Sequence, residues 1–554
     1  MCVPHKPPAI GPVKAAAMST QTVHHATYDL LRRLELTTFF GNPGSTEQTF
    51  LRNFPDDFTY VLALQEASVV AMADAFAQVT GKPALVNVHT AAGLGNAMGS
   101  LVAAYDAKTP LIVTAGQQHR DMVLLEPYLA NRDETMLPRP WVKWAYQPAR
   151  AEDVPAAFMR AYAIALQPPA GPVFLSIPLD DWAKPALGTA LVRQVSHRVA
   201  PDPHRLQAFA ERINASRNPA LVLGPEVDRA GGWEAGLALA ERLRAAVYHP
   251  PLADRISFPE DHPLFQGPLP LTMAGISTRL AGHDLVVVIG APVFRYYPFI
   301  DGPYLPEGTE LLQVTCDPDT AACAAVGDSL LGDATLALEG LLDRVSAAPA
   351  DRRSLTPLSW PRELPATPSN PLTPPEAYAA LADVRPADAV IVNESTSTMV
   401  QQLEWLPTLR SGAFFATASG GIGWGVPGAV GVALGDRARG VHRTVLATIG
   451  DGSFQYSVQA IWTAAQHKLP IVFVVFRNGE YSILKSFAKL EEAPGVPGLD
   501  LPGLDIVSVA KGFGLRAVHA NTALEIRDQV KFAIEAEGPT VIVVETQPQD
   551  AHLG

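Results

Sequence analysis

The stretch IGDGSFQYSVQAIWTAAQHKLPIVFVVFRNGEYSIL, from Ile449 to Leu484, decides the fold. It follows an apolar run with β-branched residues, Thr444 to Ile449, which stops at Gly450-Asp451-Gly452. A second apolar run, Ile471 to Phe476, stops at Arg477-Asn478-Gly479. Both runs have the length and composition of buried strands, and both end in residues typical of turns.

An amphipathic helix, predicted over Tyr456–His467, connects the two strands into a parallel βαβ unit. Parallel strands end at the same edge of a sheet, so Asp451 and Asn478, 27 positions apart, are expected to emerge together. A carboxylate beside an amide oxygen suits Mg²⁺ or Ca²⁺ if a phosphate supplies further oxygens. The alternative is an ordinary pair of turns, because a Gly-Asp-Gly triplet alone is common.

Composition narrows the class of protein. The chain has 554 residues, 48% of them hydrophobic, which predicts a soluble protein of several domains. A net charge of −13 argues against nucleic acid or an anionic membrane as the main partner. Three cysteines without metal spacing and the lack of a transmembrane run favour a reducing, cytoplasmic setting.

Breaks in composition predict five segments. Residues 1–19 resemble a disordered extension, or translation upstream of Met18, rather than a secretory signal. Residues 20–190, 200–345 and 375–554 each alternate apolar strands with helical stretches, which is typical of parallel sheets covered on both faces. Residues 346–374, rich in proline and charge, are interpreted as a surface linker.

Polar residues follow successive predicted strands of the first domain. Ser45, Glu66 and His89 each stand where a strand ends, the edge at which such sheets bind ligands. Each has an ordinary explanation: Ser45 as a helix N-cap, Glu66 as a charge favoured by the helix dipole, and His89 as a hydrogen-bonded core histidine. Together they form a candidate acid–base group.

The second domain lacks the glycine spacing of a dinucleotide site. Its segment Phe294-Arg295-Tyr296-Tyr297 follows a strand and either reaches into a neighbouring cleft or packs its own aromatics. In the third domain, the stretch from Ala416 to Gly425 echoes Thr90–Gly95 of the first domain, which hints at a duplication.

With these segments in view, the chain from Thr22 to its end resembles the benzoylformate decarboxylase branch of the thiamine diphosphate-dependent 2-oxo acid decarboxylases. The stretches that carry the resemblance are FFGNPGSTEQTFL, YVLALQEASVVAMADAFAQ, HTAAGLGNAMGSL, PLIVTAGQQHRDM, LPRPWVKWAYQPA, GHDLVVVIGAPVFRY, VTCDP, VNESTST and GGIGWGVPGAVGVAL, followed by the Gly-Asp-Gly to Asn motif. The motif marks the superfamily, and the other stretches together mark the branch.

The resemblance implies three doubly wound α/β domains, which bind the cofactor pyrimidine, form the centre, and bind the diphosphate. It implies a homotetramer built from dimers, with each active site between two chains. It further implies thiamine diphosphate with Mg²⁺ or Ca²⁺ as cofactors, a small 2-oxo acid and its aldehyde as ligands, and a place in mandelate catabolism.

Roles follow by matching positions. Glu66 matches the glutamate that hydrogen-bonds the aminopyrimidine and so activates the cofactor, and Ile422 matches the apolar residue that holds the cofactor bent. Ser45 and His89 match residues that bind the substrate and move protons. Metal ligands implied are Asp451, Asn478 and the backbone carbonyl of Glu480. Cofactor-contacting positions implied are Asn42, Glu394, Thr396, Ser397, Gly420, Ile422, Gly452, Ser453 and Tyr481.

The chain also departs from the branch. Tyr297 stands where a second catalytic histidine is usual, and a tyrosine proton is much less available at pH 7. Tyr128 and Leu129 replace a small aliphatic pair, and Ile483 replaces an alanine in a pocket wall that Leu484 and Phe487 continue. These changes predict an altered acyl group or competing carboligation.

Three classes of function remain open from the sequence. The first is decarboxylation of benzoylformate or a similar 2-oxo acid, and the second is carboligation or aldehyde cleavage on the same scaffold. The third is a non-catalytic homologue, against which the intact Ser45, Glu66, His89 and metal motif argue. A flavin-containing synthase is a weaker variant of the enzymatic class.

Overall fold

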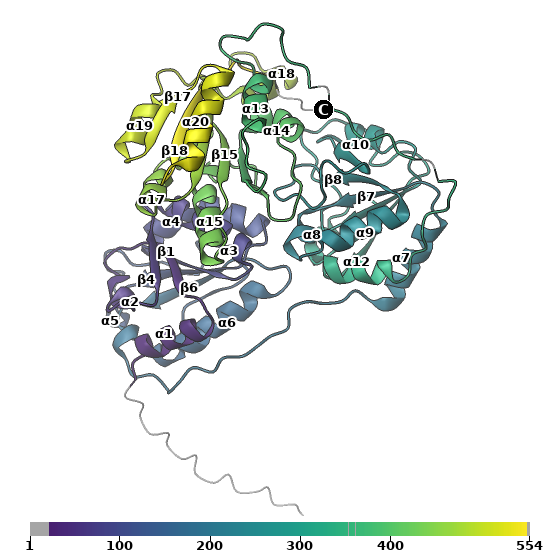
Figure 1. Cartoon of the computed structure of the whole chain (residues 1–554). Coiled ribbons are helices and arrows are strands. Elements are labelled where there is room, and N and C mark those ends of the chain that lie inside the picture. Colours follow the sequence, from purple (N-terminus) through teal and green to yellow (C-terminus); the bar gives the residue numbers. More distant parts are fainter. Residues whose placement is uncertain (1–20, 134, 353, 361, 551–554) are drawn as a thin grey trace, which may run out of the picture.

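Three parallel sheets organise the chain. The computed structural model describes residues 21–550 except 134, 353 and 361, so the predicted extension at residues 1–19 lies outside the described residues. Each sheet has six strands, and the paired strands in all three run parallel. The N-terminal sheet (purple in Figure 1), the central sheet (teal) and the C-terminal sheet (green to yellow) lie in three separate domains. The predicted fold class is confirmed.

The N-terminal sheet has the strand order β2-β1-β3-β4-β6-β5. Its strands are β1 (Thr38–Asn42), β2 (Thr59–Leu62), β3 (Ala84–Val88), β4 (Leu111–Gln117), β5 (Ala145–Tyr146) and β6 (Val173–Pro178). Its α-helices are α1 (Val23–Arg33), α2 (Gln48–Leu51), α3 (Glu66–Thr80), α4 (Thr90–Asp106), α5 (Arg120–Val123) and α6 (Val154–Leu166).

The central sheet has the order β12-β11-β10-β7-β8-β9. Its strands are β7 (Pro219–Leu223), β8 (Ala246–His249), β9 (Phe265–Pro268), β10 (Leu285–Ile289), β11 (Glu310–Thr315) and β12 (Asp328–Leu331). Its helices are α7 (Pro203–Ala215), α8 (Pro225–Arg229), α9 (Trp233–Leu243), α10 (Met273–Arg279), α11 (Pro318–Ala322) and α12 (Ala334–Leu342).

The C-terminal sheet has the order β14-β13-β15-β16-β18-β17. Its strands are β13 (Val390–Glu394), β14 (Phe414–Ala416), β15 (Val445–Gly450), β16 (Ile471–Arg477), β17 (Arg516–His519) and β18 (Thr540–Glu545). Its helices are α13 (Pro374–Ala382), α14 (Met399–Trp405), α15 (Gly425–Ala438), α16 (Asp451–Tyr456), α17 (Ala460–Gln466), α18 (Ser482–Leu490), α19 (Ile506–Gly512) and α20 (Ala523–Glu535). Strand for strand, this order repeats that of the N-terminal sheet, which supports the duplication that the sequence hinted at.

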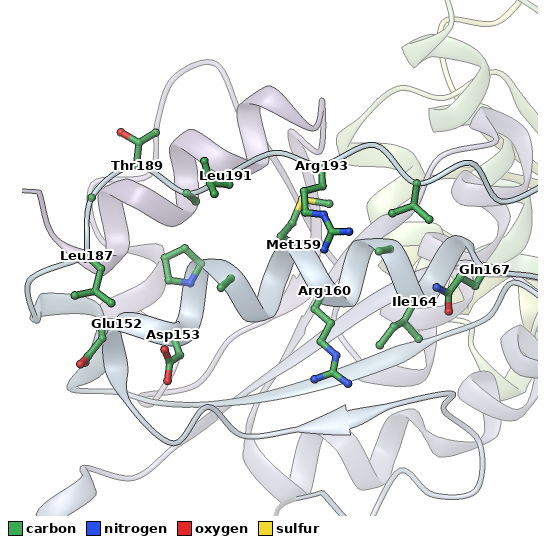
Figure 2. A pocket seen from close by; sticks show the side chains of 16 residues that line it. Glu152, Asp153, Met159, Arg160, Ile164, Gln167, Leu187, Thr189, Leu191 and Arg193 are labelled. Carbon is green, nitrogen blue, oxygen red and sulfur yellow. The ribbon is translucent and has the colours of Figure 1, made fainter. Parts of the chain in front are cut away.

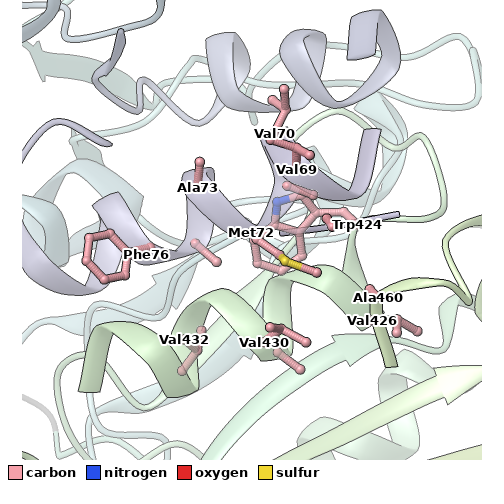
Figure 3. Packing of buried hydrophobic residues seen from close by; sticks show 14 of the residues in the cluster. Val69, Val70, Met72, Ala73, Phe76, Trp424, Val426, Val430, Val432 and Ala460 are labelled. Carbon is pink, nitrogen blue, oxygen red and sulfur yellow. The ribbon is translucent and has the colours of Figure 1, made fainter. Parts of the chain in front are cut away.

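The N- and C-terminal domains meet through helices α3 and α15. Small residues let the two backbones approach, since a Cβ on Gly431 would lie 2.2 Å from the carbonyl oxygen of Met72. A single buried cluster therefore spans both domains, and Figure 3 shows Met72 and Phe76 of α3 facing Val430 and Val432 of α15. Each large aliphatic or aromatic side chain buried there contributes about 1.5–3 kcal/mol.

One predicted helix is wrong in its bounds. Tyr456–His467 is not continuous: α16 begins at Asp451, immediately after an extended Gly450, and ends at Tyr456. The chain then breaks at Ser457 before α17 begins at Ala460. The sequence predicts a turn at the Gly-Asp-Gly segment, because these residues are typical of turns. In the structure only its first glycine lies outside the helix.

Two extended connections join the domains. Residues 187–200 contain no helix or strand and run along α6, leaving a groove of about 830 Å³ lined by Leu187, Leu191 and Met159 among others (Figure 2). In the described part of the chain, the groove lining includes none of the predicted site residues. The described residues of 346–373 form only an isolated bridge, between Leu372 and Thr546. No helix within the described ranges has the length and apolarity that crossing a membrane requires.

Candidate active site

Glu66 lies at the carboxyl edge of the N-terminal sheet, as the first residue of α3. Its carboxylate is largely buried and accepts hydrogen bonds from Asn42 Nδ2 (3.2 Å) and Asn96 Nδ2 (3.1 Å). Gly93 keeps this place open, because a Cβ there would lie 3.1 Å from Glu66 Oε1. Among the described residues the partners are amide donors and no cation, so the carboxylate can still accept a bond from a ligand.

The same edge holds a histidine–carboxylate pair. His89 Nδ1 lies 2.8 Å from Glu47 Oε2, and Glu47 is 1% exposed. Glu47 is fixed by further donors, the backbone N–H of Gly44 (2.9 Å) and of Gly116 (2.8 Å) and the hydroxyl of Thr46 (2.8 Å). Because a carboxylate only accepts, Nδ1 carries the proton, and Nε2 is left as the reactive nitrogen.

Two ordinary explanations from the sequence are settled here. Ser45 does not cap a helix, because α2 begins at Gln48 with Glu47 as its N-cap residue. Ser45 is exposed in the turn before that helix. His89 is not a closed core residue either, since its side chain keeps 22% of its surface exposed. We call Asn42, Ser45, Glu47, Glu66 and His89 the N-terminal half-site.

Sequence reasoning missed Glu47 and Asn96. Glu47 stands in the breaker-rich segment Gly44-Ser45-Thr46-Glu47, two residues after a predicted site residue. An acidic residue at a strand end that already carries a candidate serine is the signal that could have identified it. Asn96 lies within α4 with no distinguishing pattern, and only the fold shows that it faces Glu66.

The metal motif lies at the carboxyl edge of the C-terminal sheet. Strands β15 and β16 pair in parallel up to Gly450 and Phe476, so Asp451 and Asn478 leave the sheet as neighbours. Asp451 accepts the N–H of Gly479 (2.8 Å) and of Gly452 (2.8 Å). Burial raises the pKa of the Asp451 carboxyl above its ordinary value.

This donor set fits a hard divalent cation. Asp451 is buried, and each carboxylate oxygen keeps a second lone pair beyond its bond to a backbone N–H. Asn478 keeps a lone pair on its amide oxygen beyond the bond from the N–H of Glu480 (3.1 Å). The Glu480 side chain is occupied by Ser482 and Lys485, which leaves only its backbone for a metal. The ligand roles of Asp451, Asn478 and Glu480 remain predictions.

The loops around the motif are built for close approach to a ligand. Gly420 and Gly423 have φ of +73° and +107°, which side-chain-bearing residues rarely adopt. A Cβ on Gly452 would lie 2.4 Å from the Tyr481 ring. Among the remaining predicted cofactor positions, Thr396 is exposed, Ser397 and Ile422 are half-buried, and Glu394 and Ser453 are buried. We call Glu394, Ile422, Asp451, Asn478 and Tyr481 the C-terminal half-site.

An apolar wall adjoins the C-terminal half-site. Tyr297 of the central domain is 57% exposed, and its ring centroid lies 4.8 Å from that of Phe487 on α18. The central-domain segment thus reaches a neighbouring domain, while Phe294 and Tyr296 pack on each other inside their own. Only serines of α18 are buried, so Leu484 and its apolar neighbours stay partly exposed.

Within one chain, the described residues of the two half-sites make no direct side-chain contact of a polar or aromatic kind. Among the described residues, no hydrogen bond, ion pair or ring contact joins a side chain of one half-site to a side chain of the other. Tyr128 is 88% exposed and Leu129 lies beside it with φ +63°, and among the described ring contacts Phe487 pairs with Tyr297 and not with Tyr128. The structure therefore does not bring all predicted pocket residues together within the single chain.

Comparison with known proteins identifies the three domains. Residues 21–136, 206–341 and 395–544 match family models described as the N-terminal TPP binding, central and C-terminal TPP binding domains of thiamine pyrophosphate enzymes. The chain is 48% identical over 535 residues to a benzoylformate decarboxylase of Pseudomonas aeruginosa, covering 95% of this chain and 99% of that protein.

Solved structures agree. The benzoylformate decarboxylase of Polynucleobacter necessarius superposes with a TM-score of 0.94 at 50% identity, covering 96% of this chain and 99% of that one. The thiamine diphosphate-dependent 4-hydroxybenzoylformate decarboxylase of Rhodococcus jostii RHA1 superposes with a TM-score of 0.92 at 42% identity, covering 96% and 100%. Fold, strand-end residues and comparisons converge, and the chain belongs to the benzoylformate decarboxylase family of thiamine diphosphate-dependent enzymes.

Proposed function

We propose that this chain decarboxylates an aromatic 2-oxo acid, benzoylformate or a close analogue, to the aldehyde and CO₂ with thiamine diphosphate and Mg²⁺. The observation that carries the proposal is Glu66: a buried carboxylate, held only by two asparagine amides, at a strand edge. A carboxylate in that setting binds a ring N–H of a cofactor pyrimidine. When bound, the cofactor supplies the electron sink for the bond pair that departing CO₂ leaves behind.

The side chains of the N-terminal half-site are suited to the remaining tasks. The Ser45 hydroxyl is exposed at the strand end and can donate to a substrate carboxylate. His89, with Nδ1 fixed by Glu47, presents Nε2 to accept and return a proton. The apolar wall of Tyr297, Leu484 and Phe487 suits an aryl group.

We further propose that two chains complete each active site and that the assembly is a homotetramer of dimers. The absence of a direct polar contact between the half-sites, among the described residues of one chain, supports this proposal. So do the exposed apolar residues of the segment after β4, including Leu124, Leu125 and Tyr128, which need a covering surface. A Tyr128–Leu129 segment of one chain would then face Ile483 and Phe487 of another. The two described cysteines, Cys316 and Cys323, are free, which favours a cytoplasmic setting.

Carboligation is a second candidate, favoured by one observation. Tyr297 occupies the place of a usual histidine, and its phenol gives up a proton far less readily at pH 7. Slow protonation would leave time for a second aldehyde to be attacked. Acyloin formation from added benzaldehyde, compared between wild type and Tyr297→His, tests this candidate: an unchanged ratio of acyloin to aldehyde rejects it.

The main test is CO₂ and aldehyde release from benzoylformate with thiamine diphosphate and Mg²⁺, with pyruvate and a branched-chain 2-oxo acid in parallel. We expect the aromatic acid to have the highest kcat/KM. Turnover that favours an aliphatic acid would show that Ile483 and its neighbours redirect the substrate. The lack of turnover of every acid by cofactor-loaded protein would contradict the proposal.

A further inference from the structure

A buried carboxylate holds the start of helix α15. Glu394 ends strand β13, and its carboxylate accepts the backbone N–H of Gly423 (3.0 Å) and of Trp424 (2.9 Å). Gly425 permits this approach, because a Cβ there would lie 2.6 Å from Glu394 Cβ. Each oxygen of the carboxylate therefore holds one N–H of the backbone that directly follows Ile422.

Trp424 carries the connection onward to the N-terminal domain. Its indole Nε1 donates to Asp74 Oδ2 on α3 at 2.8 Å, and Asp74 Oδ1 accepts from Gln78 (2.9 Å). Figure 3 shows the indole of Trp424 lying between helix α3 and the start of α15. A Cβ on Gly428 would lie 2.7 Å from the indole, so a glycine at this position leaves the space that the ring occupies. The backbone and the side chain of Trp424 are thus fixed by two different carboxylates.

Ile422 depends on these anchors. Ile422 is only half-buried, so packing of its own side chain does not fix its position. Its neighbours on one side, Gly420 and Gly421, are exposed, and Gly420 has a positive φ. On its other side, Gly423 and Trp424 are buried, and their backbone N–H groups donate to Glu394. The place of the Ile422 side chain therefore follows from where Glu394 and Asp74 hold the next two residues.

Stability alone does not account for the two carboxylates. Burial raises the pKa of Glu394 to about 7, and burial also raises the pKa of Asp74. Ionising either group inside the fold therefore costs folding free energy. An uncharged hydrogen-bond acceptor at either position would not carry this ionisation cost.

We propose that Glu394 and Asp74 are positioning residues, which fix Gly423 and Trp424 and thereby hold Ile422 against the cofactor. The inference rests on the proposed function, since it takes Ile422 to be the residue that keeps the cofactor bent. It assigns Glu394 to the protein backbone rather than to the cofactor itself. It also makes α3, which carries Glu66, part of the support for the cofactor prop of the same chain.

The test compares isosteric variants by cofactor affinity and by kinetics. In Glu394→Gln, the amide NH₂ faces a backbone N–H, so one bond is lost while the volume is kept. We expect kcat to fall about 10- to 100-fold, thiamine diphosphate Kd to rise about tenfold, and KM for the 2-oxo acid to change less than about threefold. Trp424→Phe and Asp74→Leu should shift kcat and Kd in the same direction, because both break the indole bond. Asp74→Asn keeps an acceptor oxygen for the indole and should restore near wild-type values.

Matched controls separate positioning from general damage. Trp405→Phe removes a buried indole N–H that has no hydrogen-bond partner among the described residues, and Glu404→Gln neutralises another buried carboxyl of the same domain. Both should leave kcat and cofactor Kd unchanged. If Glu394→Gln unfolds at a lower temperature but keeps wild-type kcat and Kd, its carboxylate only caps α15 and the inference is overturned.

The outcomes also separate this inference from the proposed function. Wild-type protein that binds no thiamine diphosphate, measured by calorimetry without substrate, would refute the function itself. Wild-type protein that binds the cofactor, with variants that bind and turn over equally well, would refute only the positioning. If Glu394→Gln fails to fold, kcat and the Kd of thiamine diphosphate are compared between Asp74→Asn and Asp74→Leu instead. Equal values in these two variants would refute the positioning role of Asp74.

Discussion

The Glu47–His89 pair gives the sharpest prediction about the chemistry. In Glu47→Gln, one oxygen can remain where Glu47 Oε1 accepts from the Thr46 hydroxyl and the N–H of Gly116. The NH₂ then replaces Oε2 and faces His89 Nδ1 and the N–H of Gly44. A donor facing Nδ1 forces the imidazole to accept there and to carry its proton on Nε2. The nitrogen that should take the substrate proton is then already protonated.

The expected fall in kcat of Glu47→Gln follows from the loss of proton transfer to His89. Loss of a positioned general base lowers turnover by about 10²- to 10⁴-fold, or about 3–5 kcal/mol of barrier. The free energy of unfolding should fall by less, about 1.5–3 kcal/mol, because one hydrogen bond to a charged acceptor is removed while the side-chain volume is kept. Steady-state kcat with benzoylformate and thermal unfolding of the same preparation measure the two quantities.

Two companion variants make the result decisive. Glu226→Gln, in the central domain, neutralises a carboxylate that also accepts a hydroxyl and a backbone N–H but no histidine, and its kcat should stay at the wild-type value. His89→Gln alone should lower kcat by as much as the double variant Glu47→Gln/His89→Gln, because the two residues act as a unit. A folded Glu47→Gln enzyme with kcat within about threefold of wild type would refute the role assigned to this pair.

Four further outcomes are expected. Tyr297→Phe keeps the ring against Phe487 and should lower kcat about tenfold if the hydroxyl donates to the substrate, whereas unchanged kcat would leave Tyr297 as packing only. Ile483→Ala should raise kcat/KM for bulkier aryl 2-oxo acids about 10-fold relative to pyruvate, and a constant ratio would exclude Ile483 from the pocket wall. Chelation of divalent metal, or Asn478→Ala, should release thiamine diphosphate on gel filtration; retention would contradict the predicted metal site. Burial raises the pKa of Glu394 from 4.5 to about 7, so the folded state is favoured below pH 4.5 and the free energy of unfolding falls by about 3 kcal/mol as the pH rises to 7. Between pH 5 and 8, the free energy of unfolding of the apo-protein should therefore depend less on pH in Glu394→Gln than in wild type. Equal slopes in the two proteins would contradict a buried carboxylate there.

Much of the architecture follows from residue patterns. The runs Thr444–Ile449 and Ile471–Phe476 are short, apolar and bounded by turn residues, and the structure has them as the strands Val445–Gly450 and Ile471–Arg477. The neighbourhood of Asp451 and Asn478 also follows, because parallel strands share an edge. The helix after Gly450 was misjudged because local propensity disfavours a Gly-Asp-Gly start, whereas packing in the fold decides it.

What the sequence could not show is which side chains from distant segments meet. Glu47 and His89 lie 42 positions apart, and Asp74 and Trp424 lie 350 apart. No periodicity links such pairs, since their contact depends on how whole helices and sheets pack. The division of the site into two half-sites is equally invisible to local pattern, although the resemblance to a family implied it.

The most direct test of the central claim mixes two inactive variants. Glu66→Gln removes the carboxylate of the N-terminal half-site, and Asp451→Asn removes that of the C-terminal half-site. If each active site joins the two half-sites across chains, a mixed dimer has one doubly altered site and one intact site. Randomly co-assembled protein should then decarboxylate benzoylformate at about a quarter of the wild-type rate, although each variant alone is inactive. Mixed protein that stays as inactive as its parents would contradict an active site built between two chains.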